Sequence, residues 1–162
     1  MTERAKKSKT IAPDIALQRL EALCARAEHC TYELRQKLWT WKIPQRDAEK
    51  IIDSLLSRKF VDDERFVRSF INDKINFSRW GERKILMALV AKRLPGSLIR
   101  DILANEVDKE KIKQNLLDVL LSKARTLKEP HTFEGRTKLF RYAVSRGYYP
   151  DLISEVIRKH FA

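Results

Sequence analysis

The chain of 162 residues carries 34 lysines and arginines against 22 acidic residues, a formal net charge of +12, and 43% of it is hydrophobic. The length suits one ordinary domain or a few small repeats, and no apolar run approaches the ~20 residues of a membrane span. Four glycines and five prolines are few for strands joined by tight turns, so the composition favours helices with short connections.

A basic stretch and a first group of three predicted helices open the chain. Residues 1–14 are basic without a following apolar region, so we expect a flexible basic tail and no secretory signal. From Ile15 the apolar side chains step at helical spacing, and Thr31 is placed to cap a second helix. An amphipathic third helix follows Pro44, which makes residues 15–59 a first repeat.

A second group of three helices is predicted for residues 60–107. Asp62 and Asp63 directly precede a helix with apolar residues at helical spacing. We therefore expect one of these carboxylates to cap that helix, and not to bind a metal. The chain breaks at residues 78–81, and a second helix follows and ends at a Pro-Gly turn before the third.

The third group, residues 108–162, opens with the longest run of helical periodicity in the chain. A loop at residues 128–135, with Pro130 and Gly135, leads to a helix that ends at the stop signal Gly147, and a last helix follows. No segment of four or more residues is better described as a strand. The sequence therefore predicts nine helices.

Apolar positions recur in one register in all three groups, at offsets of 51 and 54 residues. Such fixed-period similarity indicates stacked units, none of which can bury its apolar face alone. The predicted fold class is all-α, with three tandem three-helix repeats in an elongated, curved array that offers a long surface. The corresponding sets are Leu34, Ile85 and Leu139; Leu38, Leu89 and Ala143; Ile43, Leu94 and Tyr148; and Ile51, Ile102 and Val156.

Positive charge is concentrated in two segments. The middle basic segment, residues 74–100, has seven lysines and arginines against Glu82 alone, and the C-terminal basic segment, residues 123–146, has seven against two acidic residues. Residues 101–118 between them are net acidic. This distribution indicates contact with a polyanion such as a nucleic acid, or with an acidic groove of a protein.

Residue types that carry catalysis or bind cofactors lack the spacing that such chemistry requires. The glycines are too far apart for a phosphate-binding loop, and no Ser or Cys comes with a recognisable base and orienting partner. Cys24, His29 and Cys30 match no known zinc finger and lack a fourth ligand. We therefore expect no catalytic residue, cofactor or metal, and the two thiols fit a cytoplasmic protein. Trp39 and Trp80 adjoin basic residues, so stacking on bases remains open beside simple packing.

Five short motifs follow one another along residues 15–161. The most recognisable is FVDDERFV at residues 60–67, where an aromatic and an aliphatic residue precede two aspartates and then a basic and an aromatic residue. The others are Ala16-Leu17 with Leu20 and Leu23, Thr31 with Glu33-Leu34 and Lys37-Leu38, Gly81 with Lys84-Ile85 and Leu89, and Arg146-Gly147-Tyr148 with Ile153. In this order and spacing they resemble the bacterial RecX family of regulatory proteins. The sequence departs from the family at Lys42 and Arg93, where glycine is frequent, so the geometry of these two turns is open.

This resemblance implies an all-helical array of three-helix repeats that binds the filament of RecA on single-stranded DNA. Proteins of the family are not enzymes, and they lower ATP hydrolysis, strand exchange and co-protease activity of RecA. We therefore expect a monomer that lodges in the filament groove or blocks filament extension, with RecA and single-stranded DNA as partners and no membrane contact. The alternative is a stand-alone basic DNA-binding module that acts without RecA, and a third possibility is a structural adaptor.

The candidate contact residues are carried over from the family by surface type, and not as proven contacts. They are basic residues within the two basic segments, where exposed cations would meet phosphate or carboxylate groups. These RecA- or DNA-binding candidates are Arg79, Arg83, Lys84, Lys92 and Arg93 in the middle basic segment and Arg136, Lys138, Arg141 and Arg146 in the C-terminal one.

Overall fold

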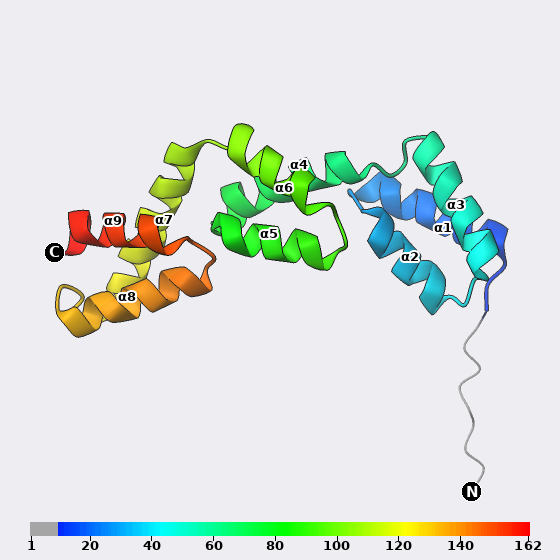
Figure 1. Ribbon diagram of the computed structural model, residues 1–162. Coiled ribbons are helices and arrows are strands. Elements are labelled where there is room, and N and C mark those ends of the chain that lie inside the picture. The colour runs from blue at the N-terminus through cyan, green and yellow to red at the C-terminus, as the bar shows by residue number, and fades with distance from the viewer. Residues whose placement is uncertain (1–9) are drawn as a thin grey trace, which may run out of the picture. The chain divides into compact units, whose positions relative to one another are not determined.

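The computed structural model describes residues 10–162, in which it shows nine α-helices, one short π-helix and no strand (Figure 1). The all-helical prediction is confirmed. The α-helices are α1 (Pro13–Arg26), α2 (Thr31–Thr40), α3 (Gln45–Ser57), α4 (Asp63–Asp73), α5 (Glu82–Ala91), α6 (Gly96–Asn105), α7 (Lys109–Ala124), α8 (Phe133–Ser145) and α9 (Pro150–Phe161), and the π-helix η1 is Lys74–Ser78.

Two compact units divide the chain, and the boundary between Phe66 and Val67 lies inside α4. In the first unit α1 and α2 both pack on α3, and in the second α5 packs on α6 while α7, α8 and α9 pack on one another. Most of the tail predicted for residues 1–14 lies outside the described residues, and α1 already begins at Pro13. The repeat boundaries at residues 59 and 107 stay a prediction.

The apolar positions that recur in the sequence form the core. All twelve residues of the four repeated sets are at most 7% exposed, and Leu34, Ile85 and Leu139 are fully buried. In the first unit these positions join Leu20 and Leu55 in one hydrophobic cluster. Removing this much apolar surface from water is the main term that stabilises each repeat, at ~25 cal/mol per Å².

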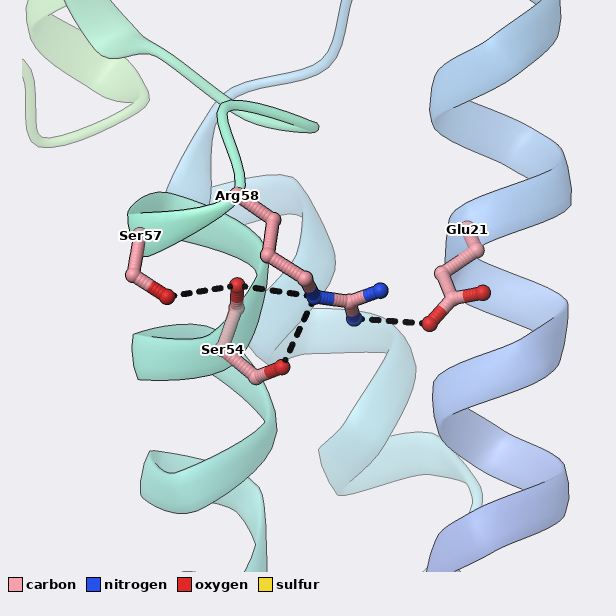
Figure 2. Close-up of polar contacts among 4 residues, drawn as sticks. All are labelled: Glu21, Ser54, Ser57 and Arg58. Carbon is pink, nitrogen blue, oxygen red and sulfur yellow. Dashed lines mark hydrogen bonds and ion pairs between the residues drawn. The ribbon is translucent and has the colours of Figure 1, made fainter.

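A polar contact on the surface of the first unit ties the end of α3 to α1 (Figure 2). The Nη2 atom of Arg58, the residue that ends α3, donates to Oε1 of Glu21 at 2.7 Å. Its Nε atom donates to the carbonyl oxygen of Ser54 at 3.3 Å and to Oγ of the same residue at 3.1 Å. The side chain of Arg58 therefore adds to the hydrogen bonds at the end of α3 and links two helices of one repeat.

The two aspartates of the FVDD segment cap two different helices. Oδ1 of Asp62 accepts the backbone N–H of Arg65 at 3.0 Å, so Asp62 caps α4 as expected. The carboxylate of Asp63 instead accepts the backbone N–H of Thr31 at 2.8 Å and the hydroxyl of Thr31 at 2.7 Å. Asp63 thus caps the N-terminus of α2, and the prediction that Thr31 caps this helix is wrong. Thr31 is the first residue of α2, and Cys30 holds the cap position.

The second helix of each repeat ends in a left-handed turn. Lys42 and Arg93 both have φ of 56°, and Gly147 has φ of 95°. After the left-handed residue the chain turns back, and the N–H groups of Ile43 and Tyr148 donate to carbonyls five residues earlier at 3.0 and 3.2 Å. The departures from glycine at Lys42 and Arg93 therefore leave the turn in place, and each side chain bears the steric cost of a left-handed residue.

Lys42→Gly is expected to stabilise the first unit. Lys42 is exposed, and its left-handed backbone destabilises the folded state by ~1–2 kcal/mol, which glycine would relieve. Glycine also has more conformational freedom in the unfolded chain, and this offsets up to ~1 kcal/mol of that gain. The net gain is ~0.5–1 kcal/mol, which raises the melting temperature by ~1–4 °C in thermal denaturation. The control Lys50→Gly, inside α3, should lower stability by ~1 kcal/mol. A loss at both positions would mean that Lys42 is not left-handed in solution.

Two helix boundaries differ from the prediction. The helix α8 begins at Phe133, inside the predicted loop, because the hydroxyl of Thr132 accepts the N–H of Gly135 at 3.1 Å and caps it. The helix α4 continues into η1 as far as Ser78, and the left-handed Arg79, with φ of 51°, then ends it. The predicted break at residues 78–81 thus lies where the chain leaves η1 and enters α5.

Candidate functional site

Two glycines that are far apart in sequence meet in the second unit. The N–H of Gly81, which precedes α5, donates to the carbonyl of Arg146 at 2.8 Å, and the N–H of Arg83 donates to the carbonyl of Gly147 at 3.0 Å. A Cβ atom on Gly81 would lie 2.2 Å from the carbonyl carbon of Gly147, and one on Gly147 would lie 2.2 Å from Cβ of Lys84. We call this backbone contact of residues 78–84 with residues 146–148 the glycine junction.

Two side chains of the Arg146-Gly147-Tyr148 motif fasten the glycine junction. Nη2 of Arg146 donates to the carbonyl of Ser78, and the hydroxyl of Tyr148 donates to the carbonyl of Arg79 at 2.7 Å. Tyr148 is 1% exposed, and burial raises the pKa of its hydroxyl to about 12, so it stays protonated and can donate. Arg146 was a candidate contact residue, but the structure places its guanidinium against the backbone, with a buried Nε.

A cluster of cations surrounds Trp80 beside the glycine junction. The Nζ atoms of Lys74 and Lys84 lie 4.5 and 4.4 Å from the centroid of the Trp80 ring, and Phe70 meets the ring edge-on at 6.3 Å between centroids. Cation–π attraction of this kind holds each ammonium at ~0.5–1 kcal/mol in exposed sites. The half-buried Trp80 ring therefore positions two positive charges, whereas Trp39 is 79% exposed and has no cation over its ring within residues 10–162.

The remaining candidates of the middle basic segment lie at both ends of α5. Near its start, Arg79 lies 4.0 Å from Asp118 and is half exposed, and the guanidinium of Arg83 is exposed without an ion pair in residues 10–162. Lys92 and Arg93 lie at the other end of α5 and have partners of their own. The structure thus gathers Arg79, Arg83 and Lys84 around the glycine junction and sets the other two apart.

The candidates of the C-terminal basic segment separate on α8. Nζ of Lys138 pairs with Glu134 at 2.9 Å, and this hydrogen bond holds the pKa of the Glu134 carboxyl below its usual value. Nη1 of Arg136 donates to the carbonyl of His131 at 2.8 Å. Arg136 and Arg141 both line a groove between α8 and α9, and Lys138 is not part of its lining.

This groove between α8 and α9 escaped the sequence reasoning. It has a volume of about 680 Å³, and its lining adds Phe133, Phe140 and Arg158 to the two candidate arginines. Counting charge by segment overlooked it, because the basic residues of α8 were not assigned to helix faces. The recurrence of Phe133, Arg136, Phe140 and Arg141 at helical spacing is the signal that could have found it.

Metal-binding clusters and membrane-spanning helices are both absent from the part of the chain that the structure describes. Within residues 10–162, no three His, Cys, Asp or Glu side chains come together in the manner of a metal site. None of the helices in the same range is long and apolar enough to cross a membrane.

The sequence of this chain is similar to a family model and to known regulatory proteins. The family model described as "RecX, second three-helix domain" matches residues 62–103, which contain α4, α5 and α6 up to Leu103. The regulatory protein RecX of Clostridium beijerinckii is 30% identical over 162 residues, covering 96% of this chain and 75% of that protein. RecX of Clostridium botulinum is 30% identical over 129 residues, covering 78% of this chain and 59% of that protein.

Solved structures agree on the fold. The crystal structure of RecX from Lactobacillus salivarius has a TM-score of 0.79 at 16% identity, and it covers 91% of this chain and 95% of that one. A second crystal structure of a regulatory protein RecX has a TM-score of 0.80 at 18% identity over 90% of this chain and 71% of that one. At such identities the likeness shows the fold, and it confirms three tandem three-helix repeats. With the sequence match, it follows that the chain belongs to the RecX family of regulatory proteins.

Proposed function

We propose that this protein binds the filament of RecA on single-stranded DNA and inhibits RecA. The filament-bound protein would lower ATP hydrolysis, strand exchange and co-protease activity, either by lodging in the filament groove or by blocking filament extension. Family membership supports a regulatory role, and the resemblance to RecX proteins implies RecA as the target. The observation that carries the proposal is the cluster of cations around Trp80, beside the backbone hydrogen bonds of the glycine junction.

The electrostatics of this cluster favour a polyanionic partner. Within residues 10–162, Lys74 and Lys84 contact an aromatic ring and pair with no carboxylate, so no ion pair there neutralises their positive charge. Arg83 adds an exposed guanidinium at the start of α5, on a helix whose first turn is held by the carbonyl of Gly147. Fixed cations without paired carboxylates attract phosphate groups and acidic protein surfaces at a distance of about one Debye length, ~8–10 Å.

The first experiment is a titration of the single-stranded-DNA-dependent ATPase of the cognate RecA with this protein near physiological salt. Inhibition well below one molecule per RecA monomer would support a filament modulator that blocks growth. Inhibition only near a one-to-one ratio would support groove occupancy along the filament. No inhibition at any ratio would contradict the proposed function.

Arg83→Glu is expected to weaken this inhibition without unfolding the protein. An acidic residue in the first turn of α5 suits the helix dipole, and the exposed side chain leaves no buried group unpaired. The concentration for half-inhibition should rise about fivefold, equivalent to ~1 kcal/mol of binding, and further when Lys84→Glu is added.

Lys50→Glu is the matched control for this charge reversal. Lys50 is exposed on α3, outside both basic segments, and its replacement makes the same change in net charge. Circular dichroism would verify that each variant remains folded. Equal inhibition by folded Arg83→Glu and by the wild type would remove this surface from the proposed contact.

Direct DNA binding without RecA is the second candidate, because a tryptophan with two lysines is also suited to single-stranded DNA. Binding that neutralises ~5 phosphates would give a log–log salt slope of about −3.5 on single strands and about −4.5 on duplex DNA. Tight binding to bare DNA at physiological salt, together with no effect on RecA, would favour this candidate.

A further inference from the structure

The groove between α8 and α9 is built from one face of each helix. On α8 the lining residues recur at intervals of three and four, and on α9 they follow the same spacing, so the groove runs along both helices. The two helices pack directly on each other, as the orange and red ribbons in Figure 1 show. The lining consists of Phe133, Arg136, Thr137, Phe140, Arg141, Ser154, Ile157, Arg158 and Ala162.

The floor of this groove is apolar, and part of it is open to solvent. Ile157 is buried, with 8% of its surface exposed, and Phe140 is half-buried. Phe133, at the start of α8, is 81% exposed. A groove of about 680 Å³ has room for two or three apolar side chains of a ligand. An exposed phenylalanine beside such a floor is typical of an interaction surface and leaves apolar area for a partner to cover.

The rim of the groove is positively charged. Three arginines line it, Arg136, Arg141 and Arg158, and no aspartate or glutamate side chain among the described residues is part of the lining. Two of the nearby carboxylates on the same helices are already engaged, since Glu134 pairs with Lys138 at 2.9 Å and Glu155 pairs with Lys113 at 2.5 Å. The rim therefore offers three guanidinium groups that could donate hydrogen bonds to carboxylates of a ligand.

We propose that this groove binds a short acidic amphipathic helix of a partner protein. The lining on α8 extends over residues 133–141, about 12 Å at 1.5 Å per residue, which matches about two turns of a ligand helix. Apolar side chains of the ligand at positions i, i+3 or i+4, and i+7 enter between α8 and α9, and flanking carboxylates meet the three arginines. A nucleic acid would pair with the arginines but would leave the apolar floor uncovered, so the groove chemistry favours a peptide.

The test uses a fluorescein-labelled peptide of about 16 residues with leucine at those spacings and glutamate on the flanks. Fluorescence anisotropy with the full chain should show a Kd of about 10–100 µM at low salt, as expected for a small open groove. Two peptide controls, one with each glutamate replaced by glutamine and one with each leucine replaced by serine, should both bind at least about fivefold more weakly. Binding of either control as tight as the parent peptide would overturn the proposal.

Protein variants then locate the site. Arg141→Glu should raise the Kd about tenfold, because it replaces a charge-assisted hydrogen-bond donor by a like charge. Phe133→Ser should raise it about threefold and leave the fold intact, since Phe133 is largely exposed. Lys111→Glu on α7 makes the same charge change outside the groove and should leave the Kd within about twofold.

Two results would contradict the site. An equal loss with Lys111→Glu and Arg141→Glu would show unspecific attraction to a basic protein. If unlabelled oligo(dT) displaced the labelled peptide completely, and if Arg141→Glu also abolished the binding of oligo(dT), the groove would be a nucleic-acid-binding surface. No RecA is present in these measurements, so failure of the peptide leaves the proposed function untouched, and failure of ATPase inhibition leaves this site untouched.

Discussion

Gly147→Ala is expected to destabilise the second unit by ~3 kcal/mol or more. Its φ of 95° is unfavourable for any residue with a Cβ atom, and that atom would lie 2.2 Å from Cβ and 2.7 Å from the backbone nitrogen of Lys84. The left-handed backbone costs ~1–2 kcal/mol, and forcing apart a packed contact adds ~1–3 kcal/mol. Relief would require moving the start of α5 away from the turn between α8 and α9, which also breaks the hydrogen bonds of the glycine junction.

Thermal and urea denaturation would measure this loss, with a fall in melting temperature of ~6–12 °C. Gly81→Ala should behave alike, because its Cβ atom would meet the carbonyl group of Gly147 at 2.2–2.3 Å. Gly96→Ala is the matched control, since the added Cβ atom meets only the flexible end of Arg100 at 3.1 Å and stability should change by less than ~1 kcal/mol. If Gly147→Ala were tolerated as well as Gly96→Ala, the close approach at the glycine junction would not exist in solution.

Asp63→Ala is expected to cost the first unit ~2–4 kcal/mol. The carboxylate accepts two hydrogen bonds from Thr31, at 2.8 and 2.7 Å, and bonds to a charged group contribute ~1.5–3 kcal/mol each before solvent exposure is discounted. Thr31 is only 8% exposed, so its N–H and hydroxyl would lose their partner in a place with little water. Asp63→Asn keeps one acceptor oxygen and should lose about half as much.

Two comparisons separate this role of Asp63 from ordinary capping of its own helix. Asp62→Ala removes the cap of α4 and should cost ~1 kcal/mol, less than Asp63→Ala. A double-mutant cycle between Asp63→Ala and Thr31→Ala should show a coupling of ~1 kcal/mol or more, because the two residues share the lost bond. Additive losses in urea denaturation would show that Asp63 and Thr31 do not interact in solution.

The basic residues show how far charge counting predicts a site. Counting selected nine cations from two segments, and it treated them as equivalent surface groups. In the folded chain Arg146 is turned to the backbone, Lys138 is paired with Glu134, and Arg83 remains exposed. A formal charge is a property of the residue, whereas its availability to a partner depends on neighbours that the fold brings close.

Local features of the sequence determined the helices and the core. Helical periodicity and capping residues act over three or four positions, so the repeated sets around Leu34 and Leu38 predict the buried helix faces from sequence alone. The left-handed end of the second helix is also local, because the turn is closed by hydrogen bonds within six residues. It therefore forms at Lys42 and Arg93 without the glycine that Gly147 supplies.

Only the tertiary structure decided which distant groups meet. Nothing near Asp63 in sequence indicates that its carboxylate caps α2. Nothing near the two glycines indicates that Gly81 leaves room for the backbone of Gly147, or that Gly147 leaves room for Lys84. The groove between α8 and α9 likewise depends on how two helices pack. Such contacts arise because burial of the repeated apolar faces sets the distances between helices, and the polar and glycine contacts form wherever those distances permit them.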